Sequence, residues 1–560
     1  MPPSRHVGAT ATLEPNAQAR ALSHFLNARL LGFRDQPQAA VAHLEAAIRA
    51  APTDAYLRLR LATAYDSAKQ RAKAIDVCRA ATTLAPHDAA PQLLLGRLLF
   101  SAGDREGARA AWERAIVLDA RDEAPYLALA ALHRDGGRKD ESIRVYEALV
   151  AAVPRSAAGL YRLARYHRKH KREKEAAALY ARAIDAGRSM RPLLELAFLL
   201  EEQGARKEAI ERYRQAHDMA PQSVDILIKL VELHLAADDE TLAKHYADKL
   251  REEAASDAKA RLRLALAFLT ANRAGPATEE LRAVVALAPG EHRGHYYLGV
   301  ALAQQKQYAD AAAALAAVPE SAPIHLDART QLGLVHREAG RLEDAERELR
   351  AVLARAPKHV TAYDLLASVQ ERRGQLAAAI ETLAKGVDAV PTEERLTTSL
   401  AVMLERAGRF DEAVSRMREV LKRNPDSASA LNFIGYSYAD RSIRMSEAET
   451  LIRKAMRLRP NDGYIVDSLG WLHFKRGELE LARTTLERAR TIAPKEAAIY
   501  DHLGEVYQRS GDRERAIEMF RQALTLEPDP RLRGQLETKL RALLGGSATT
   551  SRAHRAPAPR

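Results

Sequence analysis

The 560-residue chain has little cysteine and few aromatic residues. Its single cysteine, Cys78, excludes an intramolecular disulfide and a paired-cysteine metal centre. Aromatic residues make up 5% of the chain, against 47% hydrophobic and 29% charged residues. That balance fits many small helical layers better than a few aromatic-rich β cores, so the composition predicts an all-α protein.

Targeting and membrane-spanning segments are also missing. The first twenty residues contain no apolar core of the about 7 to 15 residues that a signal peptide needs, and no later run approaches the roughly 18 apolar residues that cross a bilayer. We therefore expect a cytoplasmic protein from the sequence as written. A true start upstream of Met1 would instead allow a periplasmic or outer-membrane-anchored location.

No catalytic motif occurs in the chain: there is no GxxxxGK[ST] or GxGxxG phosphate loop, no HExxH and no GxSxG. We therefore expect a protein that is not an enzyme and that binds no cofactor and no metal. The 86 Lys and Arg residues are interspersed with 74 Asp and Glu residues, for a formal net charge of +12. This charge predicts only a modest preference for acidic partners.

What the chain does contain is a 34-residue period. Fifteen small residues, fourteen alanines and one serine, recur at intervals of 34 residues, except for one of 33 before Ala209 and one of 35 before Ala448. Proline follows most of them twelve residues later, and a glycine or alanine precedes most of them by twelve, as in Gly470, Ala482 and Pro494. The recurring residues are Ala40, Ala74, Ala108, Ser142, Ala176, Ala209, Ala243, Ala277, Ala311, Ala345, Ala379, Ala413, Ala448, Ala482 and Ala516.

The period predicts a helix, a tight turn and a second helix in each unit. If the recurring alanine is place 20, the small residue is place 8, and small residues at both places let the two helices approach closely. Glycines such as Gly477 fall between the helices, where a left-handed residue ends the first one, and proline ends the second. The extra residue within ADRSIRMSEA predicts a longer turn, and the missing one near Gly187–Met190 predicts a shorter link.

This pattern resembles the tetratricopeptide repeat over about nine-tenths of the chain. The resemblance implies a right-handed superhelix of fifteen repeats over residues 21–530. We expect a flexible segment at residues 1–20 and a capping helix at residues 531–544, which shields the apolar face of the last repeat. Residues 545–560 are rich in Gly, Ser, Pro and Arg, and we expect them to form a disordered basic tail.

In this family, places 2, 5, 9 and 12 of the first helix line a concave groove. In the last three repeats, places 5 and 9 form a predicted aromatic and acidic strip for a partner: Asn432, Tyr436, Asp467, Trp471, Asp501 and Glu505. A large aromatic residue at a groove place is either a binding anchor or is buried under the next repeat, so Trp471 has two interpretations.

The closing repeats, LNFIGYSYAD, DSLGWLHFKRG and YDHLGEVYQRSG, are similar to those of bacterial cell-envelope tetratricopeptide proteins. These include lipoproteins that act as adaptors for carboxyl-terminal processing proteases. The resemblance implies a non-catalytic scaffold or adaptor that binds a peptide or a partner domain in its groove. The alternative it implies is a regulatory subunit that delivers substrates to a partner enzyme or activates it.

The N-terminal half carries a predicted basic groove. The run RLARYHRKHKREKE is the densest basic stretch of the chain, and basic residues recur at groove places of later repeats. They form either a positive groove for an acidic peptide or for RNA, or a solvated face, since Glu195, Glu201, Glu202 and Glu232 interrupt them. The candidate residues are Arg162, Arg165, Arg168, Lys169, Lys229, Lys259 and Arg263.

Five histidines share place 11, and Cys78 shares place 24 with Trp112 and several leucines. Because each of these places recurs in every repeat and no convergent third ligand accompanies the histidines, we expect all of them to pack in the core rather than to bind metal or react. The five histidines are His133, His167, His234, His336 and His473.

Overall fold

The computed structural model describes residues 15–527 and 530–545, and this part of the chain contains helices, turns and links without any strand. Residues 1–14 of the predicted flexible segment and residues 546–560 of the predicted tail lie outside the described residues. The first helix begins at Pro15, six residues earlier than the first predicted repeat. Proline is favoured in the first turn of a helix, where its missing N–H costs no hydrogen bond.

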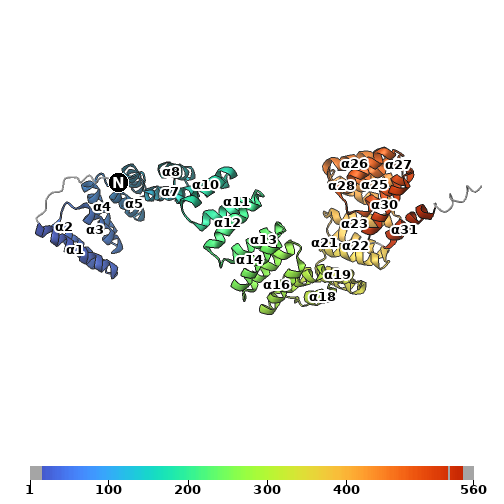
Figure 1. Ribbon diagram of the computed structural model, residues 1–560, viewed down its shortest axis with the longest axis horizontal. Coiled ribbons are helices and arrows are strands. Elements are labelled where there is room, and N and C mark those ends of the chain that lie inside the picture. Colours follow the sequence, from blue (N-terminus) through green and yellow to red (C-terminus); the bar gives the residue numbers. More distant parts are fainter. Residues whose placement is uncertain (1–14, 528–529, 546–560) are drawn as a thin grey trace, which may run out of the picture. The chain divides into compact units, whose positions relative to one another are not determined.

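Thirty-one helices follow one another in the described residues, which equals the predicted fifteen pairs and one final helix. They fall into two compact units, Met1–Ala271 and Asn272–Arg560, with neighbouring helices in chain order (Figure 1). The helices of the first unit are α1 (Pro15–Phe33), α2 (Pro37–Ala50), α3 (Ala55–Ser67), α4 (Arg71–Leu84), α5 (Ala89–Ser101), α6 (Arg105–Leu118), α7 (Glu123–Asp135), α8 (Lys139–Ala152), α9 (Ala157–Lys169), α10 (Glu173–Ala186), α11 (Met190–Glu202), α12 (Arg206–Met219), α13 (Val224–Ala236), α14 (Glu240–Glu253) and α15 (Ala258–Thr270).

The second unit continues the same alternation of first and second helices. Its helices are α16 (Ala274–Leu287), α17 (His292–Gln304), α18 (Tyr308–Ala316), α19 (His325–Glu338), α20 (Leu342–Arg355), α21 (Val360–Arg372), α22 (Leu376–Ala389), α23 (Glu394–Arg406), α24 (Phe410–Arg423), α25 (Ala428–Asp440), α26 (Met445–Leu458), α27 (Gly463–Lys475), α28 (Leu479–Ile492), α29 (Ala497–Arg509), α30 (Arg513–Leu526) and α31 (Pro530–Gly545).

The turn inside each repeat contains a residue with a positive φ, as the glycine pattern predicts. In eight repeats this residue is a glycine with φ between 74° and 91°, and Gly477, at 81°, separates α27 from α28. The other seven are Gly103, Gly137, Gly204, Gly340, Gly374, Gly408 and Gly511. A residue without a Cβ adopts this conformation at no steric cost. In the other repeats the same place is occupied by Asp35, Lys69, Lys171, Asp238, Asn272, Lys306 and Ser442.

Both predicted departures from the 34-residue period are confirmed. Four residues, 441–444, separate α25 from α26, whereas three separate the helices of the preceding repeat, and two of the four, Ser442 and Arg444, have positive φ. Three residues, 187–189, link α10 to α11, whereas four link α8 to α9. Each insertion or deletion is thus absorbed outside the helices, which keep their packing.

Close approach of the two helices in a repeat depends on the small residue at place 8. A Cβ built on Gly470 would lie 2.6 Å from Cγ of Leu486, and one on Gly504 would lie 2.5 Å from Cε1 of Phe520. The partner alanines at place 20, Ala482 and Ala516, are fully buried. The predicted role of the small residues is therefore confirmed in these repeats.

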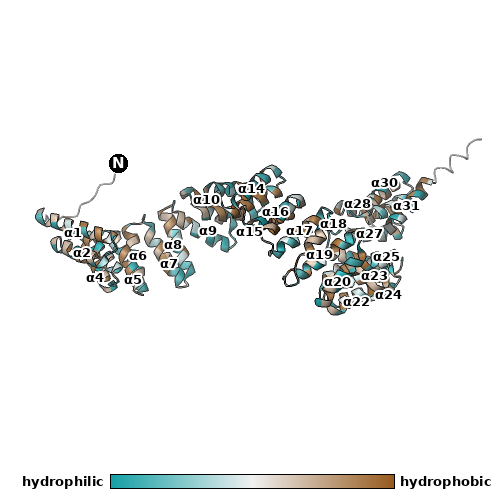
Figure 2. Ribbon diagram, turned by 90° about the horizontal axis from the view of Figure 1, so that it is seen from below, coloured by the Kyte–Doolittle hydropathy of each residue, from teal (hydrophilic) through white to brown (hydrophobic). Residues whose placement is uncertain are grey.

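The first helices also pack on one another along each unit. In the second unit α25 contacts α27 and α27 contacts α29, so first helices form one layer and second helices lie outside it. Hydrophobic and hydrophilic residues alternate along the helices (Figure 2), as expected for helices with one buried face. The last helix, α31, packs on α30 and buries Leu536 against the core that contains Phe520, which agrees with a capping role.

We predict that Gly470→Ala lowers the free energy of unfolding of the second unit by about 1–3 kcal/mol, because the new methyl group overpacks the contact with Leu486. The matched control is Gly534→Ala in α31, where a Cβ meets nothing within 4 Å. That change should raise stability by up to about 1 kcal/mol, because alanine favours the helix.

Denaturant unfolding followed by the fluorescence of Trp471 measures both effects. A Trp112→Phe background removes the only other tryptophan, which lies in the first unit. A Gly470→Ala variant as stable as its parent would show that the close approach does not depend on the glycine.

Candidate functional site

A concavity of about 530 Å³ lies on the first-helix layer of the second unit. Helices α23, α25, α27 and α29 line it, together with the link before α27. Three of the predicted strip residues, Asn432, Tyr436 and Asp467, are among its lining residues, and so is His502. The structure therefore brings half of the predicted strip together around one opening.

Trp471 does not line this concavity and is only 8% exposed. Its ring stacks between two neighbours, with centroid distances of 4.1 Å to His502 and 4.8 Å to Phe474. Its Nε1 donates a hydrogen bond to Oδ1 of Asp440 at 3.0 Å. Of the two interpretations of Trp471, the structure thus shows burial under the next repeat, because His502 of that repeat covers the ring. A ligand in the concavity would lie beside the tryptophan.

Asp467 and His502 form a buried pair beneath the opening. Nδ1 of His502 lies 2.9 Å and 3.0 Å from the two carboxylate oxygens of Asp467, and both residues are less than 10% exposed. Burial alone would lower the pKa of His502, but the charge and the hydrogen bond of Asp467 outweigh it and raise the pKa. The pair therefore places two opposite charges, which compensate each other, beneath the opening.

Asp501 and Glu505 are neutralised by the capping helix. Nζ of Lys539 in α31 lies 2.7 Å from Oδ1 of Asp501 and 2.8 Å from Oε1 of Glu505. Burial opposes the charge of Lys539, but the hydrogen bonds and charges of these two carboxylates raise its pKa. The predicted acidic end of the strip thus meets a cation of the same chain rather than an open groove.

Asn432 and Tyr436 remain at the opening. Both are partly buried, and Oδ1 of Asn432 is buried without a hydrogen-bond partner in the described residues. Burial and four nearby carboxylates raise the pKa of Tyr436, so its hydroxyl stays protonated at neutral pH. The concavity thereby holds one amide acceptor without a partner, at Asn432, and a hydroxyl that stays protonated, at Tyr436.

Sequence reasoning missed His502, Asp440 and Lys539. His502 and Asp440 occupy places 6 and 13 of their repeats, next to the groove places, and their contacts cross from one repeat to another. Lys539 lies in the capping helix, outside the period. A signal for His502 exists in the sequence, since a histidine directly follows the groove residue Asp501.

Four of the seven predicted basic residues, Arg162, Arg165, Arg168 and Lys169, line one pocket of about 870 Å³ in the first unit. The other three lie elsewhere. Lys229 pairs with Glu201 at 3.3 Å and with Glu232 at 2.9 Å, Arg263 pairs with Asp225 at 2.6 Å, and Lys259 is exposed.

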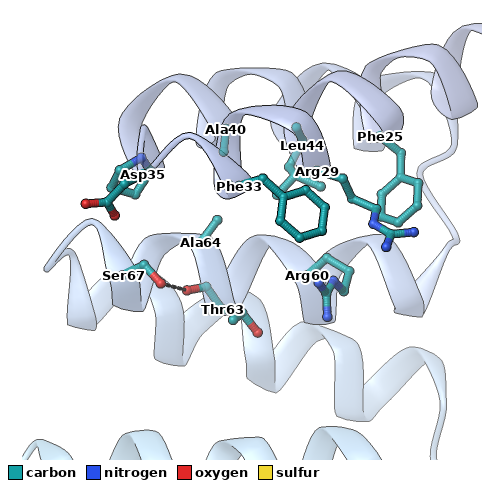
Figure 3. A pocket seen from close by; sticks show the side chains of 13 residues that line it. Phe25, Arg29, Phe33, Asp35, Ala40, Leu44, Arg60, Thr63, Ala64 and Ser67 are labelled. Carbon is teal, nitrogen blue, oxygen red and sulfur yellow. Dashed lines mark hydrogen bonds between the residues drawn. The ribbon is translucent and has the colours of Figure 1, made fainter.

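A smaller pocket of about 330 Å³ lies among the first three helices of the first unit. Figure 3 shows the side chains of Arg29, Phe33 and Arg60 around it, and the hydroxyl of Ser67 donating to the backbone carbonyl of Thr63 at 3.1 Å. Phe33, at the end of α1, is 81% exposed. Asp35, Thr63 and Ser67 are its other polar lining residues, and none of the predicted residues of the strip or of the basic groove named above lines it.

The predicted packing roles of the other reactive side chains agree with the structure. Cys78 is fully buried and burial raises the pKa of its thiol to about 12, while Trp112 is 4% exposed. Four of the five place-11 histidines are buried and His167 is partly buried. Within residues 15–527 and 530–545, no group of three His, Cys, Asp or Glu side chains is arranged to hold a metal ion, and no helix has the length and hydrophobicity to span a membrane.

The fold and this layer of first helices define a helix-turn-helix repeat protein. Models described as Tetratricopeptide repeat match residues 25–89, 127–190, 262–323, 330–394 and 400–463, and a second such model matches residues 465–527. The first model alone matches more than half of the chain. The chain therefore belongs to the tetratricopeptide repeat proteins, which generally act as scaffolds for protein interactions.

One stretch of 63 residues is 49% identical to the TPR repeat-containing protein PA4667 of Pseudomonas aeruginosa. The match covers 11% of this chain and 11% of that curated relative. The predicted partnership with an envelope protease and the predicted RNA binding stay predictions.

Two solved structures are similar at low identity. A tetratricopeptide repeat protein from Parabacteroides merdae is 16% identical, with 51% of this chain and 98% of that chain covered and a TM-score of 0.37. The APC/C hetero-tetramer Cut9–Hcn1 is 14% identical, with 87% of this chain and 96% of that chain covered and a TM-score of 0.34.

We predict that His502→Gln destabilises the second unit more at acidic than at alkaline pH. The folded state raises the pKa of His502 above its ordinary value of 6.5, so the stabilisation is complete below about pH 6.5 and is lost as the pH rises through the folded-state pKa. At about pH 6 the loss should be about 3 kcal/mol, since Asp467 keeps its buried charge without a cation.

Urea unfolding followed by Trp471 fluorescence at about pH 6 and about pH 8.5 measures the difference. The control is His295→Gln, which removes another histidine of the same unit and leaves the pair of Asp467 and His502 in place. An equal loss for His502→Gln at both pH values contradicts the assignment of the proton to this pair.

Proposed function

We propose that this chain is a non-catalytic scaffold or adaptor that binds a peptide segment, or an extended edge of a partner domain, in the concavity of its second unit. The observation that carries the proposal is the opening on the first-helix layer, which holds a buried amide oxygen without a hydrogen-bond partner at Asn432. Such an acceptor gains most from a donor that arrives with a ligand.

The chemistry of the lining supports a peptide. Val402, Phe433 and Ile465 supply apolar surface, and Ser429 and Tyr436 supply hydroxyl groups. A peptide backbone presents N–H donors at regular intervals, and one of these can meet Oδ1 of Asn432 while an apolar side chain contacts Phe433. The opening thus combines the two kinds of contact that an extended segment makes.

The pairing of charges in the lining indicates a ligand segment of low charge. The two carboxylates of the lining are both paired, Asp467 with His502 at 2.9 Å and Asp462 with Arg459 at 3.8 Å. Because both of these carboxylates already have a cationic partner, a strongly charged segment would lose its hydration without gaining an unpaired counter-charge. We therefore expect uncharged, partly apolar peptides to be preferred.

Binding without catalysis agrees with the family, whose fold typically serves as a non-catalytic scaffold. The burial of Trp471 supports the same role, because its ring stacks on His502, which lines the opening, and this packing restricts the histidine side chain. A side chain restricted in this way loses less entropy when a peptide binds.

We predict that Ser429→Arg combined with Asn432→Arg weakens the binding of peptides selected on the full chain by about tenfold or more, because two long cations fill the opening and remove the amide acceptor. Peptide display against the full-length protein provides the ligands, and fluorescence anisotropy measures their affinity for each variant. The selected peptides should be rich in uncharged residues.

Thr450→Arg, on the exposed face of the second helix α26, is the matched control and should leave the affinity unchanged. Far-ultraviolet circular dichroism checks that helicity is kept. Unchanged binding by the Ser429→Arg/Asn432→Arg variant, with lost binding by Thr450→Arg, would move the site to the outer face and refute the proposal.

A further inference from the structure

A cluster of positive charge lies in the first unit, in the pocket of about 870 Å³ that helices α7 to α11 line. Six cations line this pocket against two carboxylates: Arg134, Lys139, Arg162, Arg165, Arg168 and Lys169 against Asp140 and Glu195. The proposed peptide site lies in the other unit and uses none of these residues.

Four of the six cations have no carboxylate partner in the described residues. Arg168 is paired, with Glu195 and with Glu202, and Arg134 lies 3.1 Å from Asp135. Lys139, Arg162 and Lys169 make no ion pair, and the guanidinium of Arg165 faces only the Tyr161 ring, 5.9 Å from its centroid. Like charges held in one pocket repel each other, so a bound anion would relieve the repulsion between these cations.

A buried hydroxyl points to the same ligand by an independent observation. Tyr180 lines the pocket and is fully buried, and its Oη lies near the Arg168 guanidinium and the Glu195 carboxylate without a well-formed hydrogen bond to either. Burial raises the pKa of Tyr180 to about 12, with the Arg168 cation opposing it in part, so the hydroxyl keeps its proton at neutral pH. A buried donor without an acceptor costs free energy unless a ligand supplies the acceptor.

We propose that this pocket binds the phosphate group of a phosphorylated serine or threonine in a peptide segment of a partner. A phosphomonoester carries a charge of about −1.5 to −2 and three strong acceptor oxygens, which matches several unpaired cations and one hydroxyl donor better than a single carboxylate does. Arg162 and Arg165 present the forked guanidinium groups that bind phosphate oxygens in pairs.

A peptide fits better than a nucleic acid. The cationic surface ends at the next first helices, where Glu195 and Glu202 lie around Arg168, and Glu201 and Glu232 lie around Lys229. A nucleic acid backbone needs a continuous track of phosphate contacts, whereas one phosphorylated side chain needs only the pocket. The volume leaves room beside the phosphate for the neighbouring residues of a peptide.

The test uses the full chain and three fluorescein-labelled peptides of one sequence, with phosphoserine, glutamate or serine at the central position. The phosphoserine peptide should bind about tenfold or more tightly than the glutamate peptide, and the serine peptide should bind least. Inorganic phosphate should compete with the phosphoserine peptide. Equal affinity for the phosphoserine and glutamate peptides would overturn the proposal, and so would tighter binding of a short single-stranded RNA.

Two variants locate the site. Arg162→Gln combined with Arg165→Gln should weaken phosphopeptide binding about tenfold or more, whereas Arg144→Gln combined with Lys174→Gln, the same charge change at exposed residues outside the pocket, should not. An equal loss of phosphopeptide affinity in both double variants would show that overall charge determines binding, and it would contradict a site in this pocket.

Tyr180→Phe removes only the unsatisfied hydroxyl. It should weaken phosphopeptide binding about threefold to tenfold while thermal stability stays the same or rises, because no hydrogen bond of the folded protein is lost. A variant with full affinity would refute the role of the hydroxyl. If the second unit did not bind the selected peptides, none of these phosphopeptide results would change. The two proposals can therefore be refuted independently.

Discussion

The structure depends on the close approach of two helices at a pair of small residues. Where Gly470 faces Leu486, even one methyl group would lie 2.6 Å from a carbon of the opposite helix. Where such small residues occur, the second helix packs closely behind the first, and the first helices of neighbouring repeats pack on one another. The open layer of first helices, with its concavity at α23 to α29, is a consequence of that contact.

The two units carry different chemistry on the same framework. In the second unit, pairs such as Asp467 with His502 and Asp501 with Lys539 compensate the charges of the groove and leave a nearly neutral opening. In the first unit, cations around Arg162 and Arg165 remain unpaired. The two proposed sites therefore rely on different forces, apolar and hydrogen-bond contact in the second unit and charge in the first.

The period was sufficient to predict the paired helices and the turns between them, because both follow from local rules. The capping helix lies outside the period, and its prediction rests on the resemblance to the family. A glycine such as Gly477 adopts the positive φ of the turn without steric cost, and a proline follows most of the second helices. The candidate site was predicted only in part. Places 5 and 9 predict Asn432, Tyr436 and Asp467 as groove residues, and these three line the concavity. The burial of Trp471 depends on its contact with His502 in the following repeat, and no local rule predicts a contact between repeats.

Hydrogen–deuterium exchange of the full chain, with and without a bound peptide partner, tests most directly whether the first-helix layer is the binding surface. The account predicts slower exchange in segments 429–436 and 464–468, which line the concavity, with no change in the outer helices α26 and α28. Protection confined to α26 and α28 would contradict it.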